Sequence, residues 1–244
     1  MGHTEENEYL PQHQRRRNIH KLSNEGGKYK KCLCFYLIVI TSIKEIIMRI
    51  FAVNGSPNRD GNSATLTRIL LDAAKAKGAQ IDYVNIYDYK VTDVWENYFG
   101  DALYKKFEKA EDDDMPLLKD KMASADIILL ASPIYWYQLS GKLKTFVDRW
   151  TDTINPDFSS DLRGKGLALV STHTGVNAIN ASNILQLAMD STAEFLGMQW
   201  LGGIECSSKM PFTTGRNAGH EIIAADFGEK LAQGQNLLGA PVFG

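Results

Sequence analysis

From residue 48 onward, short apolar runs alternate with segments whose apolar residues repeat at helical spacing. Five runs have the length and the Val, Ile and Leu content of buried strands: residues 50–54, 81–87, 126–132, 166–171 and 198–206. Four other segments show helical spacing: residues 63–77, 139–150, 180–196 and 218–237. The pattern therefore predicts an α/β protein in which strands and helices alternate.

The same spacing predicts which side of each helix faces the core. For residues 139–150 the inward positions are Leu139, Leu143, Phe146, Val147 and Trp150. For residues 180–196 they are Ile184, Ala188, Thr192, Phe195 and Leu196. Near-continuous apolar strands between amphipathic helices are typical of a parallel sheet covered on both faces. We expect right-handed crossovers and a doubly wound three-layer sandwich with strand order 2-1-3-4-5.

The first 47 residues differ from the rest. They hold 8 Lys and Arg against 5 Asp and Glu, whereas the remainder holds 19 against 24. Residues 32–43 are a mostly apolar run behind a basic flank, shorter than the roughly 20 residues of a membrane helix. Lys44 and Glu45 can be encoded by AAGGAG, a bacterial ribosome-binding sequence, just before Met48. We interpret residues 1–47 as a spurious or disordered extension and 48–244 as the folded domain, with an anchor or signal as the alternative.

Composition narrows the class further. The chain has 244 residues, 44% apolar and 23% charged, and a net charge of −2, which gives no indication of nucleic acid or an acidic membrane as partner. Three cysteines without a CxxC pair are too few for a disulfide framework. The sequence therefore predicts a protein of the reducing cytoplasm.

The segment GSPNRDGNS, residues 55–63, joins the first strand to the first helix. A helix amino terminus offers free N–H groups and a partial positive charge at the carboxyl edge of the sheet. Ser56, Asn62 and Ser63 add polar donors, and glycines let the backbone approach an anion closely. The loop therefore suits a phosphate group.

The spacing restricts which phosphate. A triphosphate loop needs GxxxxGK[ST], but five residues separate Gly55 from Gly61, and Asn62 stands in place of the lysine. The dinucleotide pattern GxGxxG is absent as well. Neutral donors with only Arg59 nearby suit a terminal monophosphate, such as that of FMN. A plain loop with a Ser or Asn helix cap is the alternative.

Two further loops are expected at the same edge. The third strand runs into Pro133, Tyr135, Trp136 and Tyr137, an aromatic loop that can frame a flat ring while its N–H groups bind the ring's polar edge. The alternative is that these aromatic residues, Tyr137 above all, pack in the core or in a subunit contact. After the fourth strand, STHTG at residues 171–175 suits the pyrimidine side of a flavin or an incoming substrate. His173 is either an acid or a cap of the turn.

These segments together resemble the NAD(P)H-dependent FMN reductase family of flavodoxin-like oxidoreductases. The resemblance covers about residues 48–210 and is carried by GSPNRDGNSATL, by DDDMPLL ahead of ASADIILLASPIYWYQLSGKLKTFVDRW, and by STHTG. It implies a flavodoxin-like sheet, and contacts to the FMN phosphate, the isoalloxazine ring and the ring's far edge from three sets of residues. These sets are Ser56, Asn58, Asn62, Ser63 and Ala64; Pro133, Ile134, Tyr135 and Trp136; and Thr172, His173, Thr174 and Gly175.

The resemblance also implies an activity. NADH or NADPH would give hydride to bound FMN, which would pass electrons to a small acceptor: a quinone, a nitro- or azo-aromatic compound, or free flavin. It implies homodimers or homotetramers that complete the flavin site, without nucleic acid or membrane partners. No side-chain nucleophile or base is needed, so we assign no catalytic residue. The acidic run at residues 111–115 is interpreted as solvation of a helix amino terminus rather than as a metal site.

One departure from the family concerns cysteines. Iron–sulfur relatives carry a cysteine cluster after the second strand, but the matching stretch here has none, so electrons are expected to pass through the flavin alone. Trp95, Tyr98 and Phe99 are instead expected to cover the flavin or to form the subunit contact. Two other classes stay open: a flavodoxin-type electron carrier that does not oxidise NAD(P)H itself, and a non-catalytic FMN-binding scaffold.

Overall fold

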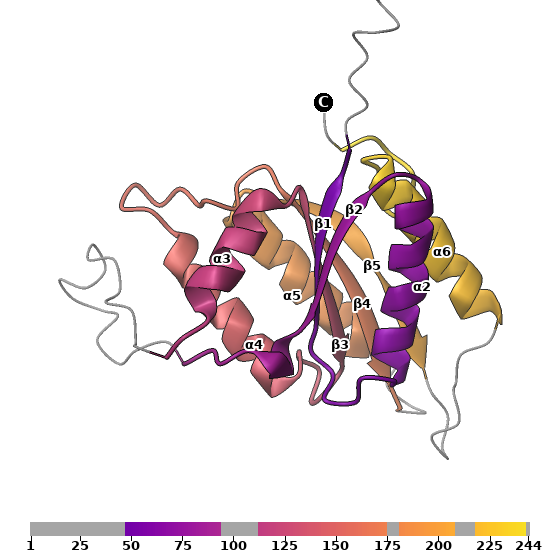
Figure 1. Ribbon diagram of the computed structural model, residues 1–244, viewed down its shortest axis with the longest axis horizontal. Coiled ribbons are helices and arrows are strands. Elements are labelled where there is room, and N and C mark those ends of the chain that lie inside the picture. The colour runs from indigo at the N-terminus through magenta and orange to yellow at the C-terminus, as the bar shows by residue number, and fades with distance from the viewer. Residues whose placement is uncertain (1–46, 94–111, 175–180, 208–217, 243–244) are drawn as a thin grey trace, which may run out of the picture. The chain divides into compact units, whose positions relative to one another are not determined.

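The protein is built on a sheet of five parallel strands (Figure 1). The computed structural model describes residues 47–93, 112–174, 181–207 and 218–242. The strands are β1 (Arg49–Asn54), β2 (Gln80–Asn85), β3 (Ile127–Pro133), β4 (Gly166–His173) and β5 (Gln199–Ser207). Their order is β2-β1-β3-β4-β5, which confirms the predicted flavodoxin-like α/β topology. All five carboxyl ends therefore meet at one edge, the lower edge of the sheet in Figure 1.

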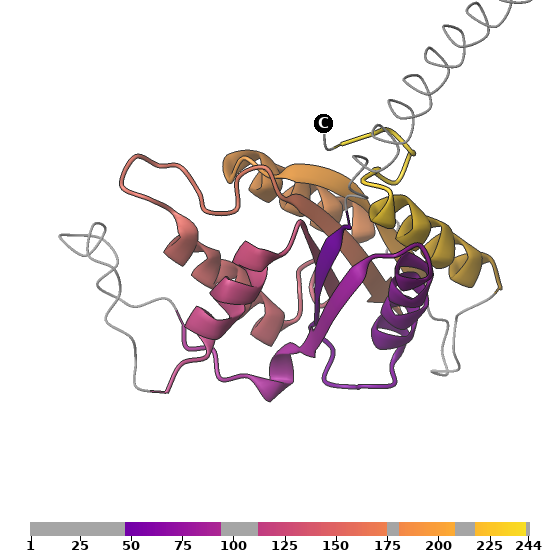
Figure 2. The same cartoon turned by 45° about the horizontal axis from the view of Figure 1, so that its top comes forward.

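Helices form a layer on each face of the sheet (Figures 1 and 2). The helices are α2 (Asn62–Ala76), α3 (Met115–Ser124), α4 (Gly141–Asp148), α5 (Ala181–Phe195) and α6 (Ala218–Ala232), with short 3-10 turns η1 (Ile86–Asp88) and η3 (Arg149–Thr153). On one face lie α3, α4 and α5, and on the other lie α2 and α6. Among these helices, none is long and apolar enough to cross a membrane.

The position of each strand in the sheet explains how apolar its sequence is. Strands β3 and β4, in the middle of the sheet, are buried along nearly their whole length, because helices exclude water from both of their faces. Edge strand β2 buries only its last two residues. Two apolar cores result, one on each side of the sheet, in which Phe51 and Ile50 point to opposite faces.

The structure corrects several details of the helices. The acidic run at residues 111–115 predicted the start of a helix, and α3 begins at Met115, but its extent was not predicted, although Met115, Leu118 and Met122 are buried at helical spacing. In α5 the predicted inward positions Ile184 and Phe195 are 44% and 71% exposed. The buried side of α5 instead contains Leu185, Met189 and Ala193, while Leu196, directly after the helix, is buried as predicted. Both faces of this helix carry apolar residues, so spacing alone did not determine which one packs on the sheet.

One residue of the acidic run, Asp113, belongs to a buried ionic network, whereas Asp112 is exposed just before the start of α3, in line with the predicted solvation. The Arg149 guanidinium donates to Asp113 at 2.8 Å and to Asp152 at 2.7 Å, and it also donates to the Thr92 carbonyl at 2.9 Å. Burial raises the pKa of Asp113, but hydrogen bonds from Arg149 and from the Met115 N–H outweigh it and hold the pKa below its ordinary value. Asp113 is thus a structural anion, not a solvated one. No cluster of three metal-ligating side chains occurs in the described ranges.

Candidate functional site

The predicted phosphate loop lies at the carboxyl end of β1 and leads directly into α2 (Figure 1). The residue that caps α2 is Gly61, which has no side chain, and no side-chain hydrogen bond caps the helix. The helix-cap interpretation of the loop is therefore wrong. The first turn of α2, formed by Asn62, Ser63 and Ala64, keeps N–H groups that the helix itself cannot satisfy. Such a turn favours an anion.

Side-chain acceptors fix the path of this loop. The N–H of Ser56 donates to Asn54 Oδ1 at 3.0 Å, and the N–H of Asn58 donates to Ser56 Oγ at 3.2 Å. Asn58 Oδ1 then accepts from the Asp60 N–H at 3.1 Å. Each bond spans two residues, so the loop is a series of local turns held by its own polar side chains.

Glycine at position 55 serves packing. A Cβ there would lie 2.6 Å from Leu143 Cβ and 2.7 Å from Ser140 Oγ, both from the start of α4. The end of β1 is thus pressed against α4, and any side chain at this position would separate them. Packing against α4 is therefore enough to explain the glycine at position 55, and the close approach to an anion expected from the sequence is not needed.

Ser63 and Thr172 lie together although they come from different loops. Their hydroxyl oxygens are 2.7 Å apart, and both residues are buried. The start of α2 is thereby joined to the carboxyl end of β4. Thr172 lies beside the phosphate loop, whereas the resemblance assigned it to the far edge of the ring.

The aromatic loop after β3 forms a tight two-residue turn. Tyr135 and Gln138 exchange two backbone hydrogen bonds, of 3.1 and 3.0 Å, around Trp136 and Tyr137. These two central residues have φ angles of +52° and +66°, the left-handed region that glycine or asparagine normally occupies in such turns. Trp136 is 93% exposed, and Tyr137 is 48% exposed, so neither packs in the core. Strain combined with exposed rings is typical of a binding element.

The third predicted segment is only partly visible in the described residues. Pro133 pairs in register with Thr172, so the aromatic turn and the end of β4 lie side by side. His173 is mostly buried, and its Nε2 lies 3.8 Å from a carboxylate oxygen of Glu205 on β5. Thr174 is exposed, and Gly175 lies outside the described residues. Trp95, Tyr98 and Phe99 also lie outside them.

The one cation of the phosphate loop is already paired. The Arg59 guanidinium binds the Asp88 carboxylate of η1 through both terminal nitrogens, one of them at 2.9 Å. The pKa of Asp88 lies below its ordinary value, chiefly because it accepts hydrogen bonds from Arg59. The loop therefore presents mainly neutral donors.

The donor set fits the phosphate of FMN. A dianion suits the uncapped first turn of α2 and the loop hydroxyls. Asn54 Nδ2, at the carboxyl end of β1, is a buried donor without a partner among the residues that the structure describes. An aromatic turn on the adjacent strand β3 suits the ring. Phosphate and ring elements thus lie on neighbouring strands of one edge.

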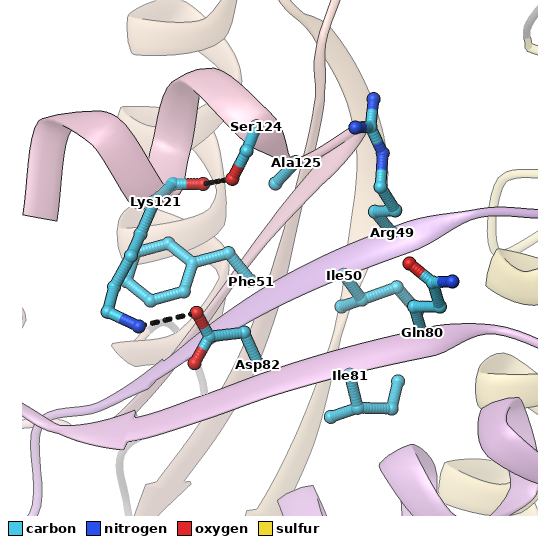
Figure 3. Close-up of a pocket in the computed structure, with 9 residues that line it drawn as sticks. All are labelled: Arg49, Ile50, Phe51, Gln80, Ile81, Asp82, Lys121, Ser124 and Ala125. Carbon is cyan, nitrogen blue, oxygen red and sulfur yellow. Dashed lines mark hydrogen bonds and ion pairs between the residues drawn. The ribbon is translucent and has the colours of Figure 1, made fainter.

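A cavity of about 330 Å³ lies at the opposite, amino-terminal edge, between α3 and strands β1 and β2 (Figure 3). Its charged groups are satisfied by neighbours: Lys121 donates to Asp82 at 2.6 Å, and Arg49 donates to Asp126 at 3.1 Å. Ligands of doubly wound sheets bind at the carboxyl edge instead. We therefore do not assign this cavity to the flavin.

Comparison with known proteins identifies the family. The model of the NADPH-dependent FMN reductase family matches residues 48–209. The chain belongs to this family. It is an NAD(P)H-dependent FMN oxidoreductase, and the family's cofactor is the one that the donor set fits. The resemblance read from the loop motifs is thereby confirmed.

Three relatives show the range of similar proteins. YwqN of Bacillus subtilis, named as an NAD(P)H-dependent FMN-containing oxidoreductase, is 24% identical over 64% of this chain and 82% of its own length. An iron–sulfur flavoprotein of Archaeoglobus fulgidus is 31% identical, but only over 42% of this chain and 45% of its own length. A quinone reductase structure from Klebsiella pneumoniae has a TM-score of 0.59 at 16% identity, covering 78% of this chain and 86% of that one, and shows the shared fold.

Sequence reasoning missed three residues that shape the site. Asn54 and Asn85 bind the phosphate loop from the ends of β1 and β2, and Asp88 binds its arginine. A polar residue that ends an apolar strand was the available signal for both asparagines. Asp88 gave no such signal, because its pairing with Arg59 joins positions that are 29 residues apart.

Proposed function

We propose that this enzyme takes reducing equivalents from NADH or NADPH and passes them to a small planar acceptor, a quinone, a nitro- or azo-aromatic compound, or a free flavin. The observation that carries the proposal is the juxtaposition of an uncapped helix start after β1 and a strained aromatic turn after β3. When bound, FMN supplies the hydride-accepting and electron-donating chemistry.

The residues of the chain supply binding and orientation. We propose that Ser56, Asn58 and the first turn of α2 bind the phosphate, with Asn62, Ser63 and Ala64 contributing as first predicted. Pro133 to Trp136 line the ring, and the segment from Thr172 to Gly175 completes the edge beside them. The N–H groups of Trp136 and Tyr137 are not used by the bonds that close the turn, so they are suited to the polar edge of the ring.

Exposed aromatic rings favour a flat acceptor. Tyr135 is 52% exposed beside Trp136, so the turn offers aromatic surface outside the core. Planar acceptors stack on such surface without needing specific hydrogen bonds. The quinone reductase with the same fold supports this class of acceptor.

The test is spectroscopic and kinetic. Residues 48–244 are expected to take up FMN with a flavoprotein absorbance spectrum, and to oxidise NADH or NADPH in steady state when a quinone, an azo dye or riboflavin is supplied. Protein that binds FMN but oxidises neither nucleotide without a separate reductase would be an electron carrier. Protein that takes up no FMN would contradict the proposal altogether.

Assembly and location complete the proposal. We propose a homodimer or homotetramer in the cytoplasm, supported by the exposed aromatic turn and by the low cysteine content. Light scattering of the FMN-loaded protein measures the assembly. A monomer at micromolar concentration would contradict that part.

A further inference from the structure

Two asparagines lie at paired positions beneath the phosphate loop. Asn54 ends β1 and Asn85 ends β2, and the two are register partners in the parallel ladder. Asn54 is completely buried, and Asn85 is 6% exposed. Buried asparagine is uncommon, because its amide must be hydrogen-bonded to offset the loss of water.

Both side chains bind the same loop residue. Asn54 Oδ1 accepts from the Ser56 N–H, and Asn85 Nδ2 donates to the Ser56 carbonyl, each at 3.0 Å. Asn85 Oδ1 also accepts from the Tyr87 N–H at 2.9 Å, which fixes the orientation of its own amide. The backbone donor and acceptor of Ser56 are thus both held by buried amides from two adjacent strands.

The effect extends along the loop through Ser56. Its hydroxyl accepts from the Asn58 N–H, and Asn58 in turn accepts from Gly61 through its carbonyl at 3.2 Å. Gly61 is the cap residue of α2. A continuous series of hydrogen bonds therefore runs from the two asparagines to the uncapped helix start.

We infer that Asn54 and Asn85 are positioning residues for the FMN phosphate, acting through Ser56 without touching the ring. The inference rests on the proposed function, because it takes residues 55–64 as the phosphate site. Neutral amides suit this task, since a carboxylate at either position would repel the phosphate. The unpartnered Nδ2 of Asn54 also supports a role in binding. An apolar residue at this position would avoid a buried unsatisfied donor, so stability alone does not explain the asparagine.

The test compares two ligands that differ only in the phosphate. Affinities for FMN and riboflavin are measured by fluorescence titration for the parent protein, Asn54→Ala, Asn85→Ala and the double variant. Each single variant is expected to bind FMN about tenfold more weakly, the effect of about one hydrogen bond, with riboflavin affinity unchanged. The double variant should lose less than the product of the two, because both asparagines hold one residue.

Asn236→Ala is the matched control. Its Oδ1 also accepts backbone N–H groups, from Leu238 and Ala240 at 3.0 Å each, in a turn near the carboxyl end. It should leave both affinities unchanged. If the alanine variants fail to fold, Asn54→Val and Asn85→Val, which favour a strand and carry no hydrogen-bonding group, take their place.

Two results would overturn the inference alone. They are unchanged affinities for both flavins in the variants, and an equal loss of both affinities, which would indicate general structural damage. A parent protein that binds neither flavin would instead contradict the proposed function itself. A parent that prefers FMN, with variants that lose only this preference, supports both.

Discussion

The phosphate loop and the aromatic turn lie on neighbouring strands, yet they are built in opposite ways. Ser56 and Ser63 in the loop are buried, and their polar atoms are bound to other side chains and to backbone. The turn is held by two backbone hydrogen bonds, its central residues are strained, and Trp136 is almost fully exposed. The fold thus holds the phosphate loop in place before any ligand binds, whereas the side chains of the aromatic turn stay exposed.

This difference matches the chemistry that each end would meet. A phosphate is small and highly charged, so its donors must be held in position before it binds. A planar ring contacts its surroundings mainly by stacking, which tolerates movement, and the enzyme must also admit a nucleotide and an acceptor. Variants at the phosphate loop should therefore weaken the binding of FMN selectively, whereas variants at the aromatic turn should weaken the binding of FMN and riboflavin alike.

The largest effect is expected from Ser63→Glu. It places a carboxylate at a position that is only 2% exposed, where the phosphate is predicted to bind. FMN affinity should fall at least about a hundredfold, since two anions would meet with little water between them. An acid in the first turn favours the helix, whereas its burial lowers stability, so circular dichroism is needed to show that α2 still forms.

Fluorescence titration with both flavins measures this effect. Ser63→Ala is the control for the lost hydroxyl, and we expect it to weaken FMN binding by about tenfold at most. A glutamate variant that keeps parental FMN affinity would show that the phosphate lies elsewhere.

Arg149→Ala should lower the free energy of unfolding without changing the preference for FMN over riboflavin. It leaves Asp113 and Asp152 without their buried partner, at a cost of about 3 kcal/mol of unfolding free energy. Urea denaturation measures the loss. Among the folded molecules the ratio of FMN to riboflavin affinity should stay as in the parent.

An exposed ion pair provides the control for that variant. Arg49→Ala removes the pair with Asp126, in which the arginine side chain is 52% exposed, and should cost much less stability than Arg149→Ala. Equal losses in the two variants would show that burial of the Arg149 network adds nothing.

Trp136→Gly should produce the smallest change, in opposite directions for stability and binding. Glycine adopts a φ of +52° without strain, so the protein should gain up to about 1 kcal/mol of stability. Loss of the ring should weaken FMN and riboflavin binding by the same factor. Thermal unfolding and the two titrations measure these effects.

Phe158→Gly is closely matched, because Phe158 has a φ of +62° and is 71% exposed in a loop between η3 and β4. It should raise stability and leave flavin binding unchanged. If a Trp136 variant binds both flavins with the parental affinity, the aromatic turn is not part of the flavin site.

Much of the fold could be predicted because burial repeats along the chain. Continuous apolar runs gave the central strands, and their alternation with helices gave the order 2-1-3-4-5. Prediction was wrong where two patterns compete locally. Helix α5 has apolar residues on both sides, and only contact with the sheet distinguishes Leu185 from the exposed Ile184. The acidic run indicated the start of α3, but not that Asp113 pairs with a distant arginine.

By itself, the sequence determined the family, the loop that suits a single phosphate and the aromatic segment beside it, because glycine spacing and residue type are local properties. Only the tertiary structure decided that Thr172 bonds to Ser63 and that Asn85 binds the Ser56 carbonyl. The physical reason is distance along the chain. Asn85 and Ser56 are 29 residues apart, and Thr172 and Ser63 are 109 apart, so no local pattern specifies contacts that exist only after the strands have paired.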